Sequence, residues 1–194
     1  MYNSKFPTEI IVASGNLGKI AEFKEIVPEV NFISMRQAGY LDDPDETGST
    51  YKENAYIKAK AVYDALKKPV IADDSGLCVD ALGGAPGIYS ARFSGGSFAD
   101  NRALLLKRME GISDRGARFV CAVCYINEKG ETLFGEGSTE GKILFEEIGN
   151  KGFGYDNLFY SFDLNKSFGE ADEEEKNNVS HRYRAVKDLF SKLQ

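Results

Sequence analysis

The order of strand-like and helix-like segments constrains the fold of this chain more than any other feature of its sequence. Before residue 80, apolar runs typical of buried strands alternate with segments whose apolar residues recur at helical spacing. After residue 116, the extended segments 117–126 and 132–140 are joined by the turn sequence "NEKG" and predict a hairpin. Alternation followed by a meander predicts an α/β fold with a mixed sheet.

Helical periodicity is clearest between Thr50 and Pro69. Thr50 and Glu53 have the spacing of a capping box, and the proline ends the pattern. Further helices are predicted over 20–27, over 100–109 and at the end of the chain. The apolar positions of the two clearest helices are Tyr51, Ala55, Ala59, Val62 and Leu66 in one, and Val186, Leu189, Phe190 and Leu193 in the other.

The length, charge and cysteine content limit the organisation of the chain and its partners. We expect one domain over residues 1–194, because the sequence contains no repeat, linker or change in composition. A net charge of −6 disfavours a sequence-independent nucleic-acid binder, and no apolar run is long enough to span a membrane. Three cysteines and an N-terminal "MYNSKFPTE" without an apolar segment favour a cytoplasmic protein without disulfides.

Cys121 and Cys124 form a C-x-x-C pattern, but they lie within the apolar run "ARFVCAVCYI". In a strand, side chains three positions apart point to opposite faces of the sheet. We therefore predict two buried structural thiols that share neither a metal ion nor a disulfide.

The segment "SGNLGK" connects the first predicted strand to the first predicted helix. One interpretation is a connection that needs Gly and Asn for positive φ. The other is an anion site, because N–H groups at a helix N-terminus and a lysine both attract negative charge. Its spacing matches neither the Walker A loop nor the dinucleotide-binding loop.

Two adjacent carboxylates, Asp73 and Asp74, occur in "PVIADDSG". We expect them at the C-terminal end of a buried strand, where ligand sites open in α/β sheets. The side chains of adjacent strand residues point to opposite faces, but the two carboxylates can converge on one pocket if a turn begins at Ser75 and Gly76. One carboxylate could then bind a metal ion while the other acts as the general base. The alternative is an Asx-type turn without chemical function.

The acidic loop before the clearest helix contains Glu46, which has no local structural role and is a candidate ligand for a hard cation. The alternative is a solvated acidic loop. Glu53 is explained by the capping box, and Lys58 follows within the helix.

The loop "GFGYD" places Phe153 and Tyr155 between glycines, where a flat ring could stack on a base. A loop that uses these rings as core residues would have the same sequence. The single histidine, His181, lies beside Arg182 near the start of the last helix, with Lys176 just before. A single histidine is more often structural than catalytic.

Taken together, these segments resemble the inosine triphosphate pyrophosphatase family. The resemblance rests on "SGNLGK", "DETGSTYKENAYIKA", "IADDSGLCVDALGGAPGIYSARFSG", "GFGYD" and "EEKNNVSHR", and it covers essentially the whole chain after Glu9. It implies hydrolysis of inosine, deoxyinosine and xanthosine triphosphates to the monophosphate and pyrophosphate, with Mg²⁺. It also implies an elongated mixed sheet flanked by helices, two lobes with a central active-site cleft, and a homodimer.

The resemblance assigns roles by position. Glu46 and Asp73 would bind Mg²⁺, and Asp74 would accept the proton. The positions expected to hold the triphosphate are Ser14, Gly15, Asn16, Leu17, Gly18 and Lys19, and the other substrate-contacting positions are Ser75, Phe153, Gly154, Tyr155, Asp156, Lys176, His181 and Arg182.

The reaction explains these residue types. Charge on the pyrophosphate leaving group must be neutralised, which Mg²⁺, Lys19, Lys58 and Lys176 can do. Hypoxanthine and xanthine present a 6-oxo acceptor where adenine has a donor, so donors from His181 or Arg182 would favour the former.

The chain departs from the family pattern at three places. Ser14 replaces a common Thr and keeps the hydroxyl, Asn157 replaces the usual Pro after "GFGYD", and Tyr183–Arg184 replaces Gly-Gln after "SHR".

Two other functions remain open. A nucleotide sensor could lack the acidic residues, which are all present here. A septum-formation-type pyrophosphatase is disfavoured by "GAPGIYSARFSG" and "SHR".

Overall fold

The strands of the computed structural model, which describes residues 7–192, form one seven-stranded sheet in the order β2-β1-β3-β4-β5-β6-β7. Neighbours at the β2 end are parallel, and β6 is antiparallel to both β5 and β7. The sheet is therefore mixed, as predicted. The strands are β1 (Glu9–Val12), β2 (Asn31–Ser34), β3 (Val70–Val79), β4 (Gly116–Ile126), β5 (Thr132–Ile143), β6 (Phe159–Ser161) and β7 (Lys166–Ser167).

Five α-helices are found in the described residues, and the predicted helix after Thr50 is confirmed. Thr50 Oγ1 accepts a hydrogen bond from the N–H of Glu53 at 3.1 Å, and Lys67 ends the helix in the left-handed conformation. Leu193 lies outside the described residues. The helices are α1 (Leu17–Ile26), α2 (Tyr51–Leu66), α3 (Phe98–Arg108), α4 (Glu173–Asn177) and α5 (His181–Ser191), with 3-10 turns at Asp80–Leu82, Gly87–Arg92 and Asp156–Leu158.

The chain divides into two compact units. Unit 1 contains the described residues up to Asp74, residues 121–137 and those from Arg182 onward, and unit 2 contains residues 75–120 and 138–181. Three strands, β3 to β5, contribute residues to both units. The expectation of two lobes agrees with this division, and the central cleft stays a prediction.

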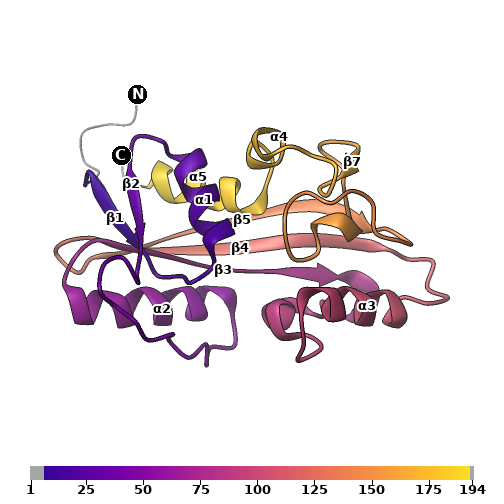
Figure 1. Cartoon of the computed structure of the whole chain (residues 1–194), viewed down its shortest axis with the longest axis horizontal. Coiled ribbons are helices and arrows are strands. Elements are labelled where there is room, and N and C mark those ends of the chain that lie inside the picture. The colour runs from indigo at the N-terminus through magenta and orange to yellow at the C-terminus, as the bar shows by residue number, and fades with distance from the viewer. Residues whose placement is uncertain (1–6, 193–194) are drawn as a thin grey trace. The chain divides into compact units, whose positions relative to one another are not determined.

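Unit 1 packs helices on both faces of its strands. Figure 1 shows α1 and α5 on one side and α2 on the other. Cys121 lies in the apolar cluster that contains Phe23 and Leu189, whereas Cys124 lies in the cluster that contains Ala59. Both thiols are free and buried, and burial raises the pKa of Cys124 to about 12. The predicted opposite orientation of the two cysteines is confirmed.

Unit 2 has one apolar cluster, built from α3 and the strands beside it. Leu105 of α3 is buried in this cluster, which also holds Leu77 of β3 and the aromatic residues Phe119, Phe159 and Phe168. Phe119 lies 4.7 Å from Phe159 between ring centroids. This packing supports the segments between β5 and α5 that carry the predicted base-contacting residues.

The prediction that β3 ends near Asp74 is wrong. The strand continues to Val79, so no turn begins at Ser75 and Gly76, and the alternative of an Asx-type turn is wrong as well. The strand that ends here is β1, whose last pair with β3 is Val12 with Ile71. Asp73 and Asp74 therefore follow the point where the parallel neighbour β1 ends, and both are buried.

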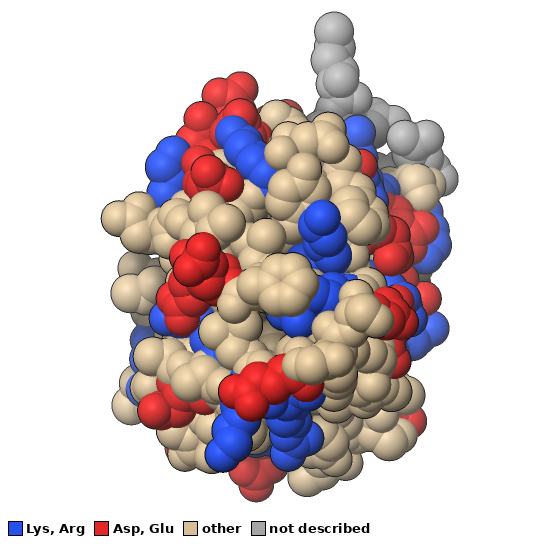
Figure 2. Space-filling model, turned by 90° about the vertical axis from the view of Figure 1, so that its right-hand side faces the viewer, with Lys and Arg blue, Asp and Glu red and all other residues tan. Residues whose placement is uncertain are grey.

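The surface carries charges of both signs. On the face shown in Figure 2, Lys and Arg side chains are interspersed with Asp and Glu rather than gathered in one basic field. The chain has a net charge of −6, and this face does not have the clustered basic residues that sequence-independent binding of nucleic acid requires (Figure 2). Within residues 7–192, no helix has the length and apolar character that crossing a bilayer requires.

Candidate active site

The loop between β1 and α1 is folded around the side chain of Asn16. Its Oδ1 accepts hydrogen bonds from the N–H groups of Gly18 (2.9 Å) and Lys19 (3.3 Å) and so caps α1. Ser14 Oγ accepts from the N–H of Asn16 at 3.1 Å. Two N–H groups of the first helical turn are thus used within the loop, and phosphate binding by residues 14–19 stays a prediction.

Asp73 faces α1 and α5 and lies against two cations. Lys19 Nζ is 3.0 Å from Asp73 Oδ2, and Arg182 Nη2 donates to the same oxygen at 2.7 Å. Arg182 also pairs with Glu22 of α1. Burial alone would raise the pKa of Asp73, but the charges of Arg182 and Lys19 outweigh burial and lower it. Asp73 is therefore ionised at neutral pH.

Asp74 points to the opposite face, toward α2. Asn54 Nδ2 donates to Asp74 Oδ2 at 3.0 Å, and Lys58 Nζ lies 3.6 Å from Asp74 Oδ1. Lys58 also pairs with Glu46 at 2.6 Å. Burial raises the pKa of Asp74 despite the nearby positive charge of Lys58. The two adjacent carboxylates thus have different partners and opposite pKa shifts.

This divergence corrects the expectation that the pair could converge through a turn. Ile71 and Ala72 already point to opposite faces, toward the two apolar clusters of unit 1, and the continuous strand keeps that alternation through Asp73 and Asp74. The carboxylate that shares a cation with Glu46 is Asp74.

The carboxylates fit a hard cation by chemistry. Glu46 and Asp74 both lie near the Lys58 ammonium, and carboxylate oxygens are the ligands that Mg²⁺ prefers. Within residues 7–192, no three Asp, Glu, His or Cys side chains gather in a metal-binding cluster. Mg²⁺ does not need one, since it commonly uses one or two carboxylates together with water and substrate phosphates.

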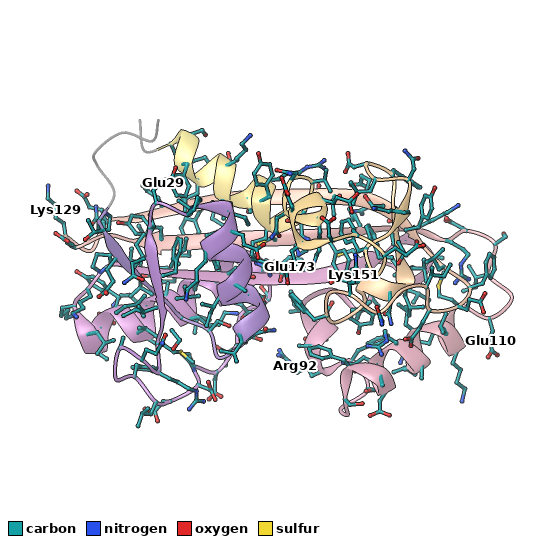
Figure 3. The ribbon with its side chains drawn as sticks, turned by 45° about the horizontal axis from the view of Figure 1, so that its top comes forward. Glu29, Arg92, Glu110, Lys129, Lys151 and Glu173 are labelled. Atoms are coloured by element: carbon teal, nitrogen blue, oxygen red, sulfur yellow. The ribbon has the colours of Figure 1, made fainter. Side chains whose placement is uncertain are left out.

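Unit 2 contains a second group of predicted residues, built around Lys176 of α4. Its Nζ lies 2.7 Å from Asp156 Oδ2 and 4.7 Å from the centroid of the Phe153 ring. Asp156 Oδ2 also accepts from the N–H of Phe153 at 2.8 Å. Lys151 and Glu173, both labelled in Figure 3, mark the segment before the "GFGYD" loop and the start of α4.

Glycine is required where this loop approaches Asp156. Gly152 has a φ of +73°, and a Cβ there would lie 2.2 Å from Asp156 Oδ2. Gly154 has a φ of +64°, again in the left-handed region. The two glycines let the loop bring Phe153 over Lys176.

Tyr155 occupies a different environment from Phe153. Its ring is 3% exposed and belongs to the apolar cluster of unit 2, and its hydroxyl donates to the carbonyl of Ser90 at 2.8 Å. Burial raises the pKa of Tyr155. Tyr155 therefore matches the interpretation as a core residue, whereas Phe153 is only partly buried.

The remaining predicted residues are placed as follows. His181 is buried, and its ring stacks on Phe119 with centroids 4.9 Å apart. Ser75 follows Asp74 within β3 and is partly buried. Arg182 is 1% exposed, and its guanidinium contacts Glu22 and Asp73. These contacts favour a role for Arg182 in holding Asp73, and base contact by Arg182 stays a prediction.

Sequence reasoning missed Glu22 and Asn54. Both are buried, Glu22 at 7% and Asn54 at 0% exposure, although both residue types are usually exposed. Their spacing in the sequence could have identified them. Glu22 lies three residues after Lys19, and Asn54 lies four residues before Lys58, so each shares a helix face with a predicted cation.

The chain is similar to known proteins over most of its length. The chain is 44% identical over 187 residues to a dITP/XTP pyrophosphatase of Halalkalibacterium halodurans, covering 93% of this chain and 96% of that protein. It is 43% identical over 183 residues to a dITP/XTP pyrophosphatase of Treponema denticola, covering 92% and 94%.

The fold is also found in solved structures. The Staphylococcus aureus Ham1 protein matches with a TM-score of 0.85 and 43% identity, covering 95% of this chain and 97% of that one. A model of the Ham1 family matches residues 10–192. The predicted resemblance is thereby confirmed, and the chain belongs to the Ham1 family.

Proposed function

We propose that this protein hydrolyses inosine, deoxyinosine and xanthosine triphosphates to the monophosphate and pyrophosphate, which removes these compounds from the nucleotide pool. The observation that carries the proposal is the set of buried Asp73 and Asp74 and partly buried Glu46, paired with three cationic side chains in unit 1. The names of the relatives, dITP/XTP pyrophosphatases, support the same substrate class.

Asp74 is the group best suited to accept a proton from the attacking water. Burial raises its pKa toward the working range of a general base. Asn54 and Lys58 hold its two oxygens in place. Water activated here would attack the α-phosphorus, and the pyrophosphate would leave with the two bonding electrons.

Lys19 and Lys58 would neutralise the leaving group. Each is already paired with a carboxylate, Lys19 with Asp73 and Lys58 with Glu46, so an incoming triphosphate would compete for these ammonium groups. The resemblance assigns Mg²⁺ to Glu46 and Asp73, but Asp73 points to the other face of β3, toward Lys19 and Arg182. Glu46 and Asp74, which share Lys58, are therefore the carboxylates that would hold the ion. When bound, Mg²⁺ would stabilise charge on the phosphate oxygens.

The residues of unit 2 suit the purine. Phe153 offers a partly exposed ring that could stack on a base. His181 supplies a donor for the 6-oxo group of hypoxanthine or xanthine, which adenine lacks. From the sequence, Lys176 is expected to neutralise the leaving group, but it lies beside Phe153, and we propose it as a second donor to the base. Ser75 and the backbone of Gly154 complete the proposed contacts.

Two other functions fit less well. A nucleotide sensor would not need a general base, whereas Asp74 is buried with two dedicated partners. A septum-formation-type pyrophosphatase would prefer other modified nucleotides, whereas the two relatives described above are named dITP/XTP pyrophosphatases. We also propose that the protein is cytoplasmic and forms a homodimer, as the resemblance implies.

The test is pyrophosphate release from a panel of purine and pyrimidine triphosphates, with and without Mg²⁺. We expect release from ITP, dITP and XTP only with Mg²⁺, at rates at least about 100-fold above those for ATP, since a hydrogen-bonding site rejects an analogue that lacks the acceptor. Asp74→Asn should lower kcat by about 10²- to 10⁴-fold while ITP still binds. Equal rates for ITP and ATP, or normal kcat in Asp74→Asn, would contradict the proposal.

A further inference from the structure

Asn54 is a buried polar residue that takes no chemical step in the proposed reaction. It is the fourth residue of α2 and is 0% exposed. Asparagine is not favoured inside helices, and a buried amide must have hydrogen-bond partners. Its presence there requires a reason beyond helix formation.

Both ends of the Asn54 amide are used. Oδ1 accepts from the N–H of Gly48 at 2.8 Å, and Nδ2 donates to Asp74 Oδ2 at 3.0 Å. A backbone N–H can only donate and a carboxylate can only accept, so this orientation of the amide is determined by its partners. Asn54 thus connects the loop before α2 to the proposed base.

The loop approaches Asn54 closely. A Cβ at Gly48 would lie 2.7 Å from Asn54 Oδ1, so only glycine fits there. Glu46, two residues earlier, pairs with Lys58, which lies one helical turn after Asn54 and 3.6 Å from Asp74 Oδ1. Two α2 side chains on one face therefore hold the two oxygens of Asp74, and both also hold the loop that carries Glu46.

A second capped helix with a buried asparagine at the same position, α3, shows what Asn54 adds. Asn101 is also the fourth residue of its helix, follows a cap in the pattern "SFADN" that parallels "TYKEN", and is 0% exposed. Its Oδ1 likewise accepts a loop N–H, from Ser94 at 2.7 Å, but its Nδ2 donates to the carbonyl of Ala91. The same device holds a loop in both units, and only Asn54 directs its donor to a carboxylate.

We propose that Asn54 is a positioning residue that orients Asp74 and couples this orientation to the placement of Glu46. This inference rests on the proposed function, in which Asp74 accepts the proton. Misplacing a reacting group by about 1 Å can lower a rate by about 10²-fold, so a bond that fixes one carboxylate oxygen is sufficient to affect catalysis.

The experiment compares Asn54→Asp with Asn101→Asp in the full chain. Each change preserves size and the acceptor for the loop N–H but replaces the donor with an oxygen. We expect Asn54→Asp to lower kcat for ITP by about 10- to 100-fold with less than a threefold change in KM. Asn101→Asp should lower the urea midpoint similarly and change kcat by less than twofold. Equal kcat losses in the two variants would overturn the proposal.

A swapped double variant tests the contact without relying on the substrate. In Asn54→Asp/Asp74→Asn, the donor and acceptor exchange places, so the hydrogen bond can form again. We expect the urea midpoint to return toward the wild-type value, while kcat stays as low as in Asp74→Asn. A midpoint no higher than that of Asn54→Asp would overturn the proposal. If wild type fails to cleave ITP, the proposed function fails, and the midpoint comparison still decides whether Asn54 orients Asp74.

Discussion

The two units hold their candidate residues in different ways. In unit 1, carboxylates and cations share partners: Asp73 lies against Lys19 and Arg182, and Lys58 lies against Glu46 and Asp74. In unit 2, one buried pair, Lys176 with Asp156, is surrounded by aromatic rings. The first arrangement contains cations that an anionic ligand could recruit, and the second places aromatic rings beside the Lys176 ammonium.

Under the proposed function, the difference matches what a triphosphate and a purine each require of the residues that bind them. A triphosphate needs several positive charges, and these must be neutralised by carboxylates when no ligand is bound. A purine needs a ring to stack on and a few directed hydrogen bonds. We therefore expect changes in unit 1 to affect folding and turnover together, and changes in unit 2 to affect substrate preference.

The largest expected effect is that of Arg182→Ala. This change would leave Asp73 and Glu22 buried without their guanidinium, and breaking a buried ion pair costs about 3–5 kcal/mol. We expect urea unfolding to show a loss of this size, and kcat/KM of the folded fraction to fall by the same factor for ITP and ATP.

Two measurements complete this test. Arg118→Ala breaks an exposed pair with Asp80 and should cost less than about 1 kcal/mol. If instead Arg182→Ala keeps near wild-type stability and the ratio of kcat/KM for ITP over ATP shrinks tenfold or more, then Arg182 contacts the base, as the family resemblance implies.

An intermediate effect is expected for Phe153→Ala. Loss of a ring that stacks on a base typically costs about 1–3 kcal/mol, so kcat/KM for ITP should fall accordingly with little change in stability. Tyr155→Phe is the control, because its hydroxyl bonds Ser90 within the core. It should cost about 0.5–1.5 kcal/mol of stability and leave kcat/KM unchanged. An unaltered kcat/KM in Phe153→Ala would show that Phe153 is only a packing residue.

Local features of the fold could be predicted from the sequence. The spacing of Cys121 and Cys124 placed them on opposite faces because strand side chains alternate, and Thr50 and Pro69 bounded α2 because both act within one helical turn. These predictions depend only on neighbours in the chain.

The partners of the candidate residues could not be predicted in this way. Arg182 and Glu22 are separated by 160 positions, and no local pattern relates them. The sequence "ADDSG" suggested a strand end, but β3 continues and it is β1 that ends beside Asp73. Pairing between strands distant in the sequence therefore decided where the carboxylates lie.

The smallest expected effect concerns Asn157, where family members usually have proline. Its Nδ2 donates to Glu147 Oε2, whose other oxygen accepts from Arg102 Nε at 2.9 Å. Arg102 Nη1 in turn donates to the carbonyl of Gly154 at 3.0 Å, in the loop that carries Phe153. These three side chains tie the loop to α3 and can supply the rigidity that the proline would give.

Glu147→Ala would release both ends of this connection. Because the carboxylate is 41% exposed, we expect a stability loss of less than about 1 kcal/mol. A looser loop would raise KM for ITP by about two- to fivefold, equivalent to less than about 1 kcal/mol, with kcat unchanged. Glu147→Gln keeps one acceptor and should have a smaller effect. Steady-state kinetics decide the matter: if KM in Glu147→Ala stays within the error of the wild-type value, the loop is held by Lys176, Asp156 and Tyr155 alone.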